Sequence, residues 1–190
     1  RTSVGIYMRV IRAVFNLCSD QDPNLKEAYP FGSDKRGKYR IQNSLKGGKR
    51  GDALTPVQLQ NFLTIKLPKD SPAWEAKMYW LFSFYCQGMN FRDLFMLKYS
   101  NIQGQLIRYT REKTKRTEEQ EIIEVPFNEE VRQIIIQMGN EDKRPGSYVF
   151  PVLDPNEKNL LKIEARIMQK IKVTNDWLEK ICVPAGLPKI

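Results

Sequence analysis

The feature that most constrains the fold is a strongly apolar segment that breaks at a glycine and resumes at once. Most residues between Ser71 and Gln87 are apolar or aromatic, so we predict a helix buried on nearly all sides at the centre of a core. Gly88 is typical of a helix end, and Asn90, with Asp93 three positions later, is typical of a helix start. The chain is therefore expected to fold around a central helix that ends in a sharp corner.

Composition limits the size of the fold and the nature of its partners. The 190 residues, of which 41% are hydrophobic, suffice for one domain or for one domain and part of another. Lysine and arginine together number 31 against 22 acidic residues, which gives a net charge of +9. Such an excess favours an anionic partner, most often nucleic acid, although a basic protein without such a partner fits the charge equally well.

What the sequence lacks excludes several chemistries. It has no histidine, and its three cysteines are scattered without the spacing of metal ligands, so we expect no metal site, no cofactor and no histidine-activated nucleophile. Cys86 lies among aromatic residues and is expected to be a small core residue in a reducing compartment. No apolar run is long enough to cross a membrane, and the first residues lack a signal-peptide pattern. The sequence therefore predicts an intracellular protein.

Further helices and two strands are predicted from local patterns. Thr55-Pro56, with Gln58 to complete a capping box, predicts a helix start. Residues 106–111 and 122–125 have strand patterns on either side of a charged loop. The other predicted helices span residues 3–18, 128–138 and 154–181, the last beginning at an Asp154–Glu157 capping box. The expected fold class is mainly α with a small antiparallel β-sheet.

A basic, glycine-rich stretch lies between the first helix and Thr55. From position 31 to 50, seven lysines and arginines stand against one aspartate, and glycines interrupt any regular helix. The stretch is expected to be a linker or an extended arm. Interleaved cations, glycine and Tyr39 suit contact with a phosphate backbone, whereas a linker without DNA contacts is an equally good interpretation.

Two of these segments together resemble the tyrosine recombinases, the phage-integrase family. One is the corner Tyr85-Cys-Gln-Gly-Met-Asn-Phe-Arg-Asp-Leu94, and the other is the hairpin Leu106–Arg116. The resemblance implies that residues 1–20 are the end of a helical core-binding domain, 21–53 a basic interdomain linker and 54–190 the first part of a catalytic domain. The family's His-x-x-Arg motif and nucleophilic tyrosine would follow Ile190, because the chain has no histidine and its last tyrosine is Tyr148.

The resemblance also implies roles for particular residues. The family's phosphate-gripping arginine falls at Asn90, so Arg92 is the candidate to substitute for it; a solvated charge in the first turn of a helix is the alternative. Lys113, with Lys115 behind it, is the candidate general acid for the leaving 5′ oxygen, and the alternative is a solvated basic loop. Predicted contacts to double-stranded DNA are Asn90, Arg108, Arg111, Lys115, Arg116, Lys38, Arg40, Lys49, Arg50, Arg9 and Arg12.

The function implied is site-specific DNA recombination or integration through a 3′-phosphotyrosine intermediate, with the enzyme acting as a homotetramer on DNA inside a prokaryotic cell. Because the motif and tyrosine are missing from these 190 residues, we expect the chain alone to bind DNA without cleaving it. Two alternatives remain open. One is a non-catalytic DNA-binding relative or fragment, and the other is a helical scaffold or RNA-associated protein whose basic charge is incidental.

Overall fold

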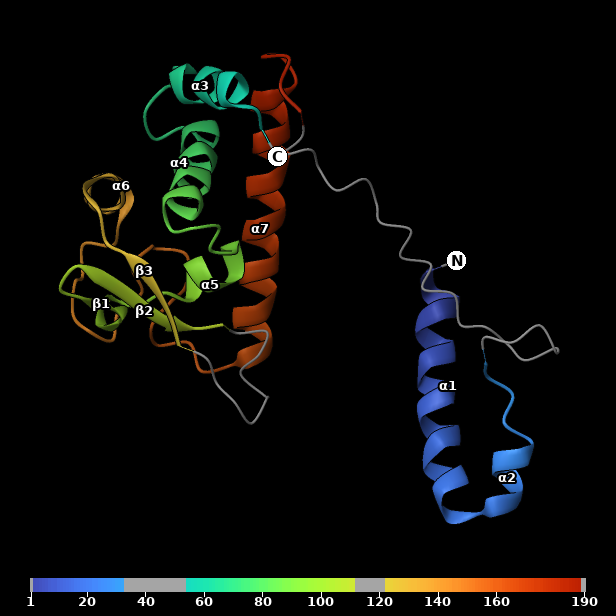
Figure 1. The fold of residues 1–190 in the computed structure, drawn as a ribbon. Helices are drawn as coiled ribbons and strands as arrows, with labels where there is room; N and C mark the ends of the chain where they lie inside the picture. Colours follow the sequence, from blue (N-terminus) through green and yellow to red (C-terminus); the bar gives the residue numbers. More distant parts are fainter. Residues whose placement is uncertain (1, 33–53, 112–121, 189–190) are drawn as a thin grey trace. The chain divides into compact units, whose positions relative to one another are not determined.

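A computed structural model describes residues 2–32, 54–111 and 122–188, which divide into two compact units, Arg1–Asp52 and Ala53–Ile190 (Figure 1). Each unit is described by itself. Several predicted site residues lie outside the described residues: Lys38, Arg40, Lys49, Arg50, Lys113, Lys115 and Arg116.

The first unit consists of a long helix and a short one. Helix α1 spans Thr2–Gln21, and α2 spans Pro23–Glu27. The side chain of Asp22 caps α2 by accepting a hydrogen bond from the Asn24 amide at 2.9 Å. An edge-to-face cluster of Phe15, Tyr29 and Phe31 ties α1 to the chain after α2, with ring centroids 5.6–6.2 Å apart. The stretch predicted as a linker therefore begins with a short helix and an aromatic contact.

The second unit has mainly helices and one small sheet. Three strands, β1 (Ile102–Gln103), β2 (Leu106–Thr110) and β3 (Ile122–Pro126), form an antiparallel sheet in the order β1-β2-β3. The predicted mainly α fold with a small antiparallel sheet is confirmed. The helices are α3 (Pro56–Thr64), α4 (Pro72–Tyr85), α5 (Phe91–Met96), the 3₁₀ helix η1 (Tyr99–Asn101), α6 (Glu129–Met138) and α7 (Leu160–Cys182).

Local capping signals position the starts of the helices around the core. Thr55 and Gln58 form the predicted capping box of α3, with hydrogen bonds of 3.3 and 2.9 Å, and Pro56 is its first residue. Ser71 caps α4 by accepting from the Trp74 amide, and Asn128 caps α6. These helices start within about a residue of their predicted positions.

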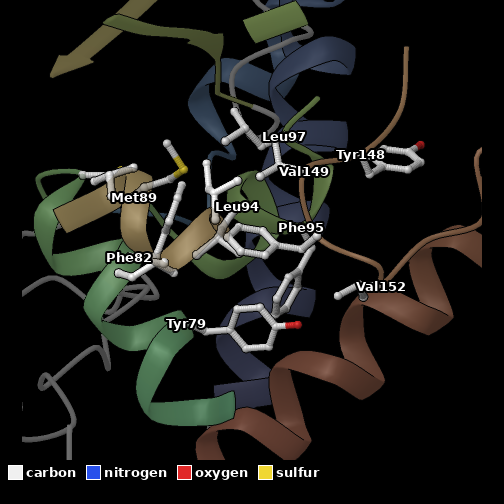
Figure 2. Packing of buried hydrophobic residues seen from close by; sticks show 14 of the residues in the cluster. Tyr79, Phe82, Met89, Leu94, Phe95, Leu97, Tyr148, Val149 and Val152 are labelled. Carbon is white, nitrogen blue, oxygen red and sulfur yellow. The ribbon is translucent and has the colours of Figure 1, made fainter. Parts of the chain in front are cut away.

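The core of the second unit is built around α4, as predicted. Tyr79 and Phe82 of α4 meet Phe150 edge to face, with ring centroids 5.4 and 4.9 Å apart. Phe95 of α5 meets Tyr79 at 5.0 Å, and both rings lie in the buried cluster of Figure 2. Cys86 is also buried here, as expected. Helix α7 runs along α4 and contacts α5 (Figure 1). The apolar α4 thus fixes the positions of α5, α6 and α7.

The corner after α4 is a Schellman turn. The Gly88 amide donates to the Ser83 carbonyl at 2.8 Å, and the Gln87 amide donates to Phe84 at 3.1 Å. Both Gln87 and Gly88 have positive φ, +58° and +82°. The helix-ending glycine was predicted, but the first left-handed residue is Gln87, so the turn contains one strained non-glycine residue.

Helix α7 begins later than predicted. Its cap is Asn159, whose side chain accepts from the Leu161 and Lys162 amides, and not Asp154. Asp154 instead accepts from the Asn156 amide, which forms a local turn that competes with a helix start. Its apolar residues are only partly buried: Ile167 and Leu178 are buried, but Leu160, Leu161 and Met168 are exposed.

Apolar residues that recur at helical spacing along α1 lie at the surface of its unit. Tyr7, Val10, Ile11, Val14 and Leu17 are 52–68% exposed within the described structure. Among the described residues, no helix is both long and apolar enough to cross a membrane.

Candidate nucleic-acid interface

The start of α5 is held by Asn90, the residue at which the sequence resemblance predicts a phosphate-gripping arginine. Its Oδ1 accepts from the Asp93 amide at 2.9 Å, and its Nδ2 donates to the Asp93 carboxylate at 2.5 Å. Asp93 itself is only 4% exposed. Asn90 is thus a helix cap that also holds a buried carboxylate, and its amide carries no positive charge for a phosphate.

Arg92, the candidate substitute, makes a bidentate ion pair with Glu164 of α7. Its Nη1 and Nη2 each lie 2.5 Å from a carboxylate oxygen, and the two side chains are 38% and 43% exposed. Hydrogen bonds from Arg92 hold the pKa of Glu164 below its usual value. Arg92 is therefore not a simple solvated charge, because it joins α5 to α7. Its role in phosphate contact stays a prediction.

Strand β2 carries two further predicted DNA contacts. The Nε of Arg108 lies 2.7 Å from Glu124, its direct partner on β3, and Nη1 donates to Gln103 at 3.1 Å. Both charged side chains are about half exposed, at 44% and 48%. Arg111 follows the end of the strand and is exposed. Arg9 and Arg12 are also exposed, but they belong to α1 in the other unit.

A pocket of about 330 Å³ lies where α5, η1 and the end of β2 meet. Its polar groups include Asp93, Lys98, Tyr109 and Tyr148. The Lys98 ammonium lies 5.4 Å from the centre of the Tyr148 ring. Burial raises the pKa of Tyr109, the Asp93 charge raises it further, and Arg111 lowers it. The pocket therefore combines a buried carboxylate with a phenol that stays neutral at physiological pH.

Neither Asn90 nor Arg111 lines the pocket, although each is next to an element that does. Asn90 holds Asp93, which lines the pocket, and Arg111 follows the end of β2, whereas Arg92 contacts α7. The prediction from sequence missed Glu164. Its helical position next to exposed residues gives no signal for a partner 72 residues away.

The two buried cysteines, Cys86 and Cys182, are not in a reactive environment. Burial raises the pKa of the Cys86 thiol to about 12 and also raises that of Cys182, so neither is a thiolate nucleophile at neutral pH. Across residues 2–32, 54–111 and 122–188, no three His, Cys, Asp or Glu side chains are grouped as metal ligands.

No family model, no curated protein and no solved structure matches this chain. The fold and the site together define an α+β unit with an arginine-bearing strand and a polar pocket beside a helix corner.

Proposed function

We propose that this chain binds duplex DNA as part of a protein that resembles the tyrosine recombinases and takes part in strand exchange through a 3′-phosphotyrosine. The observation that carries the proposal is that the start of α5, through Asp93, and the end of β2, through Tyr109 and Thr110, line one pocket. Those are the two elements through which the family is expected to grip a phosphate and protonate its leaving group.

The distribution of cations supports a DNA partner. Arg108 and Arg111 lie along and after β2, and Arg92 directly precedes the pocket's Asp93 in the chain, all with exposed or half-exposed side chains. The chain as a whole carries a net charge of +9. Arginine suits this role because its planar fork forms charge-assisted hydrogen bonds with phosphate oxygens.

A non-catalytic DNA-binding role is the second candidate, and Asn90 favours it. Its side chain is engaged as the cap of α5 and with Asp93, so the place of the phosphate-gripping arginine is taken by a neutral amide. Binding to DNA does not require that arginine, whereas stabilising the charge of a phosphodiester transition state does.

Fluorescence anisotropy of the 190-residue chain with a labelled duplex tests the proposal. We expect binding that weakens steeply with salt, with log K falling by about 0.9 per log unit of salt for each phosphate contacted. Replacing Arg108 and Arg111 together with glutamine should weaken binding and reduce the slope by about two such contacts. A matched control replaces Lys66 and Lys69, which lie on the loop after α3.

Two outcomes contradict the proposal. One is the absence of binding at low salt, and the other is tighter binding to RNA of the same sequence with no effect of the arginine substitutions. Incubation with a nicked duplex should yield no covalent protein–DNA adduct on a denaturing gel. An adduct would show that the chain cleaves DNA by itself.

A further inference from the structure

The ion pair between Arg92 and Glu164 connects two elements that are far apart in sequence. Arg92 lies in the first turn of α5, and Glu164 lies in the second turn of α7. The contact is bidentate, with both nitrogens 2.5 Å from a carboxylate oxygen. This is the geometry in which a guanidinium also binds two oxygens of a phosphate.

The pair is open to solvent. Its side chains are 38% and 43% exposed, so another anion can reach the guanidinium without unfolding either helix. An exposed pair contributes little to stability, and salt screens it. An incoming phosphate can therefore compete with the carboxylate for the guanidinium.

We propose that Glu164 is an internal competitor that occupies Arg92 until a DNA phosphate displaces it. The inference rests on the proposed function, because it takes the phosphate to belong to bound DNA. Displacement removes one link between α5 and the beginning of α7. DNA contact at the corner is thereby coupled to the packing of a helix that does not itself touch the phosphate.

The beginning of α7 is suited to respond. Leu160 and Leu161 are about 80% exposed, at 78% and 81%, and form no part of the core. The buried contacts begin at Ile163 and Ile167. Beyond Glu164, the Arg166 side chain donates to the Val152 carbonyl at 3.3 Å. Loss of the Arg92 contact should therefore loosen the first turns of α7 and leave the rest in place.

Glu124 differs from Glu164 in what it connects. It pairs with Arg108 across two strands that are already held by the backbone register of the sheet. Release of Arg108 changes the charge presented to DNA but frees no helix. Of these two ion pairs, only Arg92–Glu164 links α5 to α7. Displacement of Glu164, and not of Glu124, is therefore expected to loosen the first turns of α7.

Binding of the 190-residue chain to one labelled duplex tests the competition. Glu164→Gln keeps the side-chain size and removes the competing charge, so we expect about two- to fivefold tighter binding. Glu157→Gln is the matched control. It removes the same charge near the start of α7, but its partner is Lys162 at 3.6 Å. This control should change affinity less than Glu164→Gln does.

The double variant Arg92→Gln with Glu164→Gln separates displacement from a general charge effect. It should bind no more tightly than Arg92→Gln alone, because the gain requires the released guanidinium. An equal gain from Glu157→Gln, or a gain that persists without Arg92, overturns the proposal. If neither the wild type nor Glu164→Gln binds DNA, both this proposal and the DNA-binding function fail. If the wild type binds DNA but Glu164→Gln binds no more tightly, only the proposed competition is overturned.

Hydrogen exchange gives a second readout that binding alone does not move. DNA should speed exchange of the amides at positions 163–167 in the wild type, and Glu164→Gln should show the faster exchange without DNA. Unchanged protection there on DNA binding overturns the coupling to α7.

Discussion

The apolar core around α4 and the charged rim beside it are held by different forces. The core joins rings that are almost fully buried, such as Tyr79, Phe82 and Phe150. The rim consists of exposed ion pairs, Arg92–Glu164 and Arg108–Glu124, whose side chains are 38–48% exposed. Core contacts are lost only with the fold, whereas rim contacts can exchange partners. Stability and binding are therefore expected to respond to different substitutions.

The largest expected effect comes from the core. Phe82 is fully buried and packs against Phe150, so Phe82→Ala should lower the free energy of unfolding by about 3–5 kcal/mol. Urea unfolding followed by tryptophan fluorescence measures it. The control, Phe84→Ala, lies on the same helix but is 44% exposed, and it should cost about 1 kcal/mol or less. Equal losses would show that the core and the surface of α4 are not distinct.

A buried charge at the edge of the core gives the next largest effect. The ammonium of Lys77, a residue 7% exposed, donates to the Leu63 and Ile65 carbonyls at 2.9 and 2.7 Å, at the end of α3. Lys77→Met keeps the length of the side chain but leaves those carbonyls without that donor, so it should cost about 1–3 kcal/mol in urea unfolding. The control, Lys66→Met, is exposed and should change little. A stabilised Lys77→Met would show that burying the ammonium costs more than its hydrogen bonds return.

The parts of the fold that could be predicted from the sequence are the local ones. The capping box at Thr55 and the cap at Asn90 are signalled by residues three positions apart, so their starts are correct. The start of α7 was wrong because Asp154 and Asn159 are both good caps. A turn at Asp154, which no pattern distinguishes, decides between them.

The candidate site could be predicted only in part. The strand pattern correctly predicted β2 and β3, but not the register that places Arg108 opposite Glu124. The environment of Arg92 could not be predicted, because its partner lies 72 residues away and the packing of α7 on α5 determines the contact. The buried state of Asp93, which lines a pocket with residues of β2, likewise could not be predicted from the local sequence.

At the corner after α4, two substitutions are expected to have smaller effects on stability, of opposite sign. Gly88 has φ of +82° and open space where a Cβ would lie, so Gly88→Ala should cost about 1 kcal/mol from backbone strain alone. Gln87 has φ of +58° and an exposed side chain, so Gln87→Gly should stabilise by about 0.5 kcal/mol, since relief of strain exceeds the added chain entropy. Thermal unfolding of both variants measures the difference. Equal destabilisation by both would contradict the Schellman geometry.

The smallest expected effect lies outside the rim pairs, at the loop after α6. Asp142 accepts hydrogen bonds from the Arg144 and Ser147 side chains at 2.8 and 2.6 Å, and these hold its pKa below the ordinary 3.8. A lowered carboxyl pKa contributes stability above that ordinary value and loses it as pH falls through the folded-state pKa. Asp142→Asn should therefore lower the melting temperature slightly at pH 7, and the difference should shrink as pH falls below 3.8. The neighbouring Glu141→Gln is the control. A melting-temperature difference that stays constant down to pH 2 would mean that packing, and not the charge of Asp142, holds this loop.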